Sequence, residues 1–136
     1  MFQENCYIVS DDTKECVIID CGAFYEEEKK EITNYIRDNQ LIPKHLLCTH
    51  AHIDHNFGNY AICKEFGLKP EVCINDKILM HKLKEQAYTF IGLTYNEEIP
   101  EVEKIFKRSR YNFIWYTLFQ HTANPRPYAR FRIVLL

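Results

Sequence analysis

Short apolar runs typical of β-strands alternate along this chain with segments whose apolar residues recur at helical spacing. Residues 6–10 and 16–20 are the first two such runs, and the polar residues 11–14 between them predict a hairpin turn. From Tyr25 to about Asn39, apolar positions three and four apart are surrounded by charged residues, which predicts a helix. Strands and helices that alternate pack in layers, so the pattern predicts an α/β domain with helices on a sheet.

The middle of the chain continues the alternation. The next predicted elements are a strand at 45–49, a helix at about 56–66, a strand at 72–74, and a helix from 75 or 76 through 87. Pro43 sets the end of the first helix, and Gly67 stands where the cap of the second helix belongs. The apolar residues expected on the inner side of the last helix are Ile78, Leu79, Leu83 and Ala87.

Three histidines and an aspartate lie directly after the third predicted strand, in the segment T-H-A-H-I-D-H. His50 and His52 are two residues apart, so in an extended loop they share a side and can reach one ion. Asp54 and His55 can then turn toward a second ion. The alternative is a histidine-rich loop that binds no ion, but a strand before the loop and a helix after it would fix these side chains as a metal site requires.

This segment resembles the T-H-x-H-x-D-H signature of the metallo-β-lactamase fold family, where it also follows a strand and precedes a helix. Upstream, I-I-D-C-G at residues 18–22 is similar to the family's I-I-D-P-G, with Cys21 in the place where proline is usual. The opening F-Q-E-N-C-Y-I-V looks most like the glyoxalase II-like branch of small hydrolases. The resemblance implies an α/β fold, the amino-terminal half of a metallo-β-lactamase αββα sandwich, incomplete in this chain.

The resemblance also implies a metal centre and a reaction. One ion would be held by His50, His52 and a third histidine, and a second ion by Asp54, His55, a bridging aspartate and a further histidine. Asp54 is also expected to have a catalytic role. The expected cofactor is one or two Zn²⁺ ions, and iron or manganese would suit the same ligands. The implied reaction is hydrolysis of a small thioester or related acyl compound by a metal-activated water.

Asp20, the remaining histidines and the cysteines give weaker signals. Asp20 is a candidate for a hydrogen bond that supports the loop of residues 49–55 without touching the ion itself. An equally weighted alternative is that Asp20 only forms the turn at the end of its strand. His45 is predicted to be structural or solvated, and His81 to lie on the surface of a helix among lysines. The six cysteines contain no C-x-x-C pair, which favours reduced thiols over a zinc ribbon or a disulfide framework.

The composition changes near residue 108. All 19 acidic residues and every lysine lie in residues 1–107, whereas residues 108–136 contain five arginines and no lysine or acid. We therefore expect residues 1–107 to be a partial metallo-β-lactamase-fold domain and residues 108–136 to be an aberrant tail. The family's T-P-G-H segment, a later G-D and a final histidine are absent in frame, and His121 is the only histidine after His81.

The genetic code offers an explanation for this tail. Codons for residues 125–134 can be chosen so that reading from the second base gives P-G-H-T-P-G-S-V-S, and AAC for Asn124 supplies the preceding T. Residues 111–115, shifted in the same way, permit T-I-S-F-G. A frameshift at about residues 106–110 is therefore expected. The alternative is a genuine aromatic and arginine-rich segment that forms a strand pair or binds a partner.

Charge and hydropathy limit the kinds of partner that are expected. The net charge of −2 gives no electrostatic reason to expect nucleic acid, and residues 1–107 are net acidic, which disfavours a nuclease branch of the fold, the alternative activity. No apolar run approaches the roughly 20 residues that span a bilayer, and the start does not resemble a signal peptide. A cytoplasmic location without a membrane partner is the expectation. An inactive fragment with residual metal binding is the alternative to an active hydrolase, and the sequence gives no oligomeric state.

Overall fold

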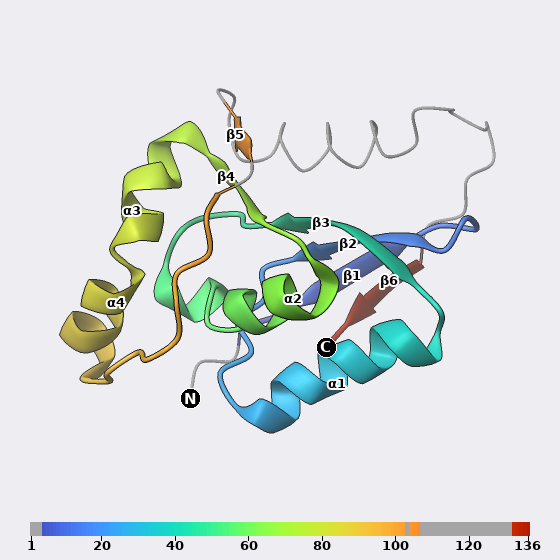
Figure 1. Ribbon diagram of the computed structural model, residues 1–136, viewed down its shortest axis with the longest axis horizontal. Coiled ribbons are helices and arrows are strands. Elements are labelled where there is room, and N and C mark those ends of the chain that lie inside the picture. The colour runs from blue at the N-terminus through green and yellow to red at the C-terminus, as the bar shows by residue number, and fades with distance from the viewer. Residues whose placement is uncertain (1–3, 103, 107–131) are drawn as a thin grey trace.

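The computed structural model describes residues 4–102, 104–106 and 132–136. Its strands and α-helices are β1 (Tyr7–Ser10), β2 (Glu15–Ile19), α1 (Glu26–Asp38), β3 (Ile42–Leu47), α2 (Asn59–Phe66), β4 (Pro70–Cys73), α3 (Lys77–His81), α4 (Leu83–Gln86), β5 (Lys104–Phe106) and β6 (Arg132–Leu135). Two 3₁₀ turns, Ile53–His55 and Ile74–Asp76, and one π-helical turn, Ala87–Ile91, complete the described elements. Figure 1 shows α1 and α2 on the same side of the sheet, with α3 and α4 beyond one end of the central strands.

Within the described residues, six strands form one sheet in the order β5-β4-β3-β2-β1-β6. The strands β2, β3, β4 and β5 run parallel, whereas β1 is antiparallel to both β2 and β6. Parallel neighbours require a crossover, which α1 provides between β2 and β3 and α2 provides between β3 and β4. The carboxyl ends of β2, β3 and β4 and the amino end of β1 therefore meet at one edge of the sheet, where loops can converge.

The two faces of the sheet follow the two-residue period of the strands. Ile8, Ile18 and Leu46 face the helices and are at most 1% exposed. They pack in one cluster with Ile32 and Ile36 of α1 and with Ile62 of α2. The next residues along the strands form a separate buried cluster on the other face, composed of Val9, Val17, Ile19 and Leu47. Full burial of such side chains stabilises the fold by roughly 1.5–3 kcal/mol each, so both faces position the strands that carry the site.

Most of the predicted elements are confirmed. The hairpin, the first helix and the second helix are present, and Gly67 ends α2 with a left-handed φ of 67°. The third strand was predicted at 45–49, whereas β3 runs from Ile42 to Leu47 and includes Pro43. The register with β2 shifts between Cys16 and Val17, and Pro43 lies opposite Cys16 at this irregularity. A bulge of this kind is one of the few places where a strand accepts proline.

The prediction of one continuous last helix is wrong. It is divided into a 3₁₀ turn, α3, α4 and a π-helical turn, with Lys82 at φ −100° and ψ 10° between α3 and α4. Ile78, expected on the inner side, is 70% exposed, whereas Met80 and Leu83 are buried. The break changes which side chains face inward, and it directs Gln86 into the interior at 7% exposure.

The last residues of the chain belong to the sheet. Arg132–Leu135 pair with the full length of β1, and Leu136 exchanges backbone hydrogen bonds with Cys6 at 3.0 and 3.3 Å. Residues 107–131, which contain the predicted frameshift junction and His121, lie outside the described residues. The division into residues 1–107 and 108–136 therefore stays a prediction.

Two remaining expectations concern thiols and membranes. No disulfide joins any of the six cysteines, and five of them are buried, as predicted for reduced thiols in apolar strands. In the part of the chain that the structure describes, no helix combines the length and the apolar character needed to cross a bilayer.

Candidate metal centre

The histidine-rich loop leaves the sheet at the carboxyl end of β3. The Cys48 N–H still donates to the Glu71 carbonyl at 3.0 Å, so the loop starts from a position fixed by the sheet. Ala51 is fully buried, and the chain then tightens into the 3₁₀ turn, where the His55 N–H donates to the His52 carbonyl at 3.2 Å. This turn reverses the direction of the chain, which places Asp54 and His55 back beside the start of the loop.

The four predicted ligands occupy neighbouring positions in this loop. The ring of His50 lies 4.7 Å from the ring of His52 in an edge-on arrangement and 3.8 Å from the ring of His55, measured between centroids. The Asp54 carboxylate lies 3.8 Å from His55 Nε2. His52 is exposed, while the side chain of His55 is only 13% exposed. The turn therefore gathers three imidazoles and one carboxylate, and their assignment as metal ligands stays a prediction.

Asp20 lies behind the loop and contacts two of the histidines, one of them through Thr49. Its carboxylate accepts hydrogen bonds from the Thr49 N–H at 2.7 Å and from the Thr49 hydroxyl at 2.5 Å. Because that hydroxyl donates its single proton to Asp20, it accepts from Nδ1 of His50, 3.0 Å away. Asp20 also lies 3.2 Å from Nδ1 of His55. Both Nδ1 atoms thus face the interior of the protein, and each ring would use Nε2 toward an ion.

The conformation of Asp20 suits this position. It follows β2 with a left-handed φ of 53°, a region that aspartate tolerates better than most residues with a side chain. Its side chain is 6% exposed, and its backbone N–H donates to the Leu47 carbonyl at 2.9 Å. Both interpretations offered by the sequence therefore hold, since Asp20 ends the strand and also hydrogen-bonds the loop.

Glu4 also lies at this edge of the sheet. Its carboxylate is 3.1 Å from Nε2 of His55, on the side of the ring opposite to Asp20. Within the described residues, Glu4, Asp54 and His55 form a group whose potential ligand atoms all lie within 4.8 Å of one another. Burial acts to lower the pKa of His55, but the Asp20 contact and the charges of Glu4 and Asp54 outweigh it and raise that pKa above its ordinary value.

Buried amide side chains hold the backbone of the loop. Asn56 Nδ2 donates to the His50 carbonyl at 3.1 Å and to the His52 carbonyl at 2.6 Å, and Asn56 itself is 1% exposed. Gln86, from α4, accepts from the Ile53 N–H at 3.1 Å and donates to the Ala51 carbonyl at 2.9 Å. These contacts satisfy the His50 and Ala51 carbonyls and the Ile53 N–H, and they give the His52 carbonyl a second donor besides the His55 N–H. They therefore define the conformation of the loop.

Gly22 allows two parts of the site to approach each other closely. A Cβ at this position would lie 2.3 Å from the backbone oxygen of Asp54 and 3.2 Å from Cβ of Glu4. The first distance is far inside van der Waals contact, so the segment after β2 packs against the metal loop only because residue 22 has no side chain.

The sequence pattern did not indicate Glu4, Asn56 or Gln86. Glu4 stands in the opening motif, and Asn56 follows the loop directly, but neither has a spacing that assigns it a role. The other histidine predictions are confirmed: His45 pairs with the buried Glu71 of the neighbouring strand, and His81 is exposed on α3.

A sequence model of the Metallo-beta-lactamase superfamily matches residues 1–128. The chain belongs to this superfamily. It is 36% identical over 90 residues to hydroxyacylglutathione hydrolase GloC of Haemophilus influenzae, a match that covers 65% of this chain and 41% of that protein. A hydroxyacylglutathione hydrolase of an Enterobacter species is 36% identical over 66 residues, which cover 48% of this chain and 24% of that protein. The chain thus spans less than half the length of these relatives.

A solved structure supports the same fold. The B3 metallo-beta-lactamase BLEG-1 superposes with a TM-score of 0.64 at 21% identity, over 76% of this chain and 48% of that protein. The predicted α/β fold of the metallo-β-lactamase family, with helices on a mixed sheet, is confirmed by this likeness and by the family match.

Membership of the superfamily implies binding of a divalent metal ion. The residues present fit such an ion, because imidazole and carboxylate are its common protein ligands and they converge here on one loop. The Nδ1 contacts of His50 and His55 are those that orient ligating imidazoles in metal sites. Beside the loop lies an apolar pocket of about 250 Å³, lined by His52, Ile53, Asp54, Gln86, Phe90 and Ile91.

Proposed function

We propose that this protein is a metal-dependent hydrolase that acts on thioesters or related acyl compounds. The observation that carries the proposal is the loop itself, in which Asp20 orients His50 through Thr49 and His55 directly. Contacts of this kind at Nδ1 orient the imidazoles that bind metal ions in proteins. The 36% identity to two hydroxyacylglutathione hydrolases supports the thioester class of substrate.

The residues of the loop have different roles in this proposal. We assign His50 and His52 to one ion and Asp54 and His55 to a second, with His50 and His55 using Nε2. A bound divalent ion would polarise the substrate carbonyl and lower the pKa of a coordinated water. We propose that Asp54, which lines the apolar pocket, orients that water and accepts its proton. The pocket beside His52 would receive the acyl group and exclude solvent from it.

Zinc is the ion that we assign, because imidazole-rich sites suit it; iron and manganese share such ligand sets. The ligand set in residues 4–102 supplies two histidines for the first ion, whereas catalytic zinc normally has three protein ligands and one open position. The third would come from the segment that we propose to be out of frame after about residue 107. We therefore expect this chain to bind zinc but to hydrolyse thioesters poorly.

The test of the proposed function is a comparison of histidine variants. The His50→Ala, His52→Ala double variant should lose at least half of the zinc that the wild-type chain binds, measured by metal analysis after dialysis. His81→Ala removes an imidazole from the exposed surface of α3 and is the matched control, expected to keep full zinc content. Unchanged zinc in the double variant would refute the assignment of His50 and His52 as metal ligands.

A further inference from the structure

The topology of the sheet brings the start of the chain to the metal loop. Strand β1 is antiparallel to β2, with Tyr7 opposite Ile19, so the residues before β1 lie beside the residues after β2. Those after β2 are at the same edge as the loop that follows the parallel strand β3. The backbone of Cys6 is fixed there by its two hydrogen bonds to Leu136. Glu4 is therefore delivered to the metal loop by a paired strand.

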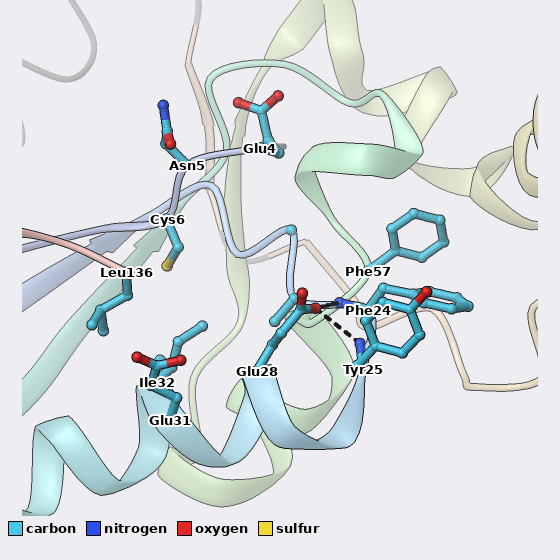
Figure 2. Close-up of a pocket in the computed structure, with 12 residues that line it drawn as sticks. Glu4, Asn5, Cys6, Phe24, Tyr25, Glu28, Glu31, Ile32, Phe57 and Leu136 are labelled. Carbon is cyan, nitrogen blue, oxygen red and sulfur yellow. Dashed lines mark hydrogen bonds between the residues drawn. The ribbon is translucent and has the colours of Figure 1, made fainter. Parts of the chain in front are cut away.

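The side chain of Glu4 is also directed to the loop. A Cβ built on Gly22 would lie 3.2 Å from Cβ of Glu4 and 2.3 Å from the Asp54 backbone oxygen, which places Gly22 between the two acidic residues. Figure 2 shows Glu4 on the rim of a pocket of about 600 Å³, with its carboxylate directed away from Glu28 and Glu31 on the other side. The side chain of Glu4 is 27% exposed.

The distances between the potential ligand atoms suit a single ion. His55 Nε2 is 3.1 Å from the Glu4 carboxylate and 3.8 Å from the Asp54 carboxylate, and all three atoms lie within 4.8 Å of one another. Around a tetrahedral ion with bonds of about 2.0–2.2 Å, ligand atoms are separated by roughly 3.3–3.6 Å. Small movements of two side chains would thus bring all three atoms into bonding distance.

We propose that Glu4 is a protein ligand of the ion held by Asp54 and His55, an inference that rests on the proposed function. The family resemblance gives this ion a bridging aspartate from a G-D pair and a late histidine, but residues 4–102 contain no G-D pair and no histidine after His81. Glu4 supplies a carboxylate in their place. Two carboxylates and one imidazole then form a three-ligand set whose members all lie within residues 4–55.

The experiment measures zinc affinity by titration against a chromophoric chelator, in the His50→Ala, His52→Ala background, where Glu4, Asp54 and His55 hold the remaining ion. Glu4→Gln keeps the shape of the side chain and should weaken zinc binding by at least about tenfold, since even outer partners of a metal site are worth that much. Glu31→Gln removes the same charge from the other side of the same pocket and should leave the affinity unchanged. Far-ultraviolet circular dichroism confirms that each variant is folded.

The outcomes separate this inference from the proposed function. Equal zinc affinity of Glu4→Gln and Glu31→Gln would mean that Glu4 only pairs with the His55 imidazolium, and would overturn the inference alone. A background that binds no zinc, while the wild-type chain does, would also overturn it, because three ligands suffice to hold zinc. A wild-type chain that binds no zinc would refute the proposed function together with the role of Glu4.

Discussion

Replacement of Gln86 by methionine should loosen the metal loop from α4. Methionine has nearly the same length and volume but no hydrogen-bonding amide. The change removes the acceptor of the Ile53 N–H at 3.1 Å and the donor to the Ala51 carbonyl at 2.9 Å, together with a third contact to the Leu79 carbonyl at 3.1 Å. Ala51 and Ile53 are buried, at 0% and 3% exposure, so water does not replace the lost partners.

The magnitude follows from the number of groups left without a partner. Each buried backbone group that loses its hydrogen bond costs about 1–3 kcal/mol. Two such groups in the loop give an expected loss of about 2–4 kcal/mol in the free energy of unfolding, after allowance for the favourable burial of the methionine side chain. At a urea dependence of about 2 kcal/mol per molar, the unfolding midpoint should fall by roughly 1–2 M.

The assay is equilibrium urea unfolding followed by circular dichroism, with a zinc titration on the same protein. Glu85→Met is the matched control, because Glu85 is the exposed neighbour of Gln86 on the same short helix. We expect Gln86→Met to lose both stability and zinc affinity, and the control to lose neither. If Gln86→Met matched the control within 0.5 kcal/mol, about the size of an ordinary surface change, Gln86 would not be an anchor of the loop.

Two further predictions concern the approach of Gly22 to the loop and the reading frame. Gly22→Ala should lower zinc affinity and cost about 1–3 kcal/mol of stability, because the added Cβ overpacks against Asp54. Gly67→Ala is the control and should leave zinc affinity unchanged, because no atom lies within 4 Å of its added Cβ. Equal zinc affinity of the two variants would contradict the argument that Gly22 permits the close approach. Genomic DNA across codons 100–136 should contain a frame that encodes T-P-G-H, and the same frame should encode G-D and a late histidine farther on. Absence of T-P-G-H from every frame would show that residues 108–136 are native sequence.

Local sequence patterns determined the elements and the candidate ligands of this protein. The hairpin, the first two helices and the buried strand before the histidines depend on periodicity and turn residues within ten or so positions, which the chain displays directly. The spacing of His50, His52, Asp54 and His55 is likewise local, so the loop could be found without the fold. Pro43 and the broken last helix were missed because tertiary packing overrode the local pattern there.

Only the tertiary structure decided what surrounds those ligands. Glu4 and Gln86 are 51 and 31 residues from His55 along the chain, and no period of a strand or helix relates them to the loop. For Asp20, 35 residues from His55, the sequence left two interpretations open, and the structure shows that both hold. These residues converge because β1 and β2 are antiparallel, β2 and β3 are parallel, and the helix break after β4 turns Gln86 inward. Strand order and direction are set by packing of the whole core and not by any one segment. The sequence therefore indicates His50, His52, Asp54 and His55 as candidate ligands, whereas the arrangement of the sheet brings distant residues such as Glu4 to them.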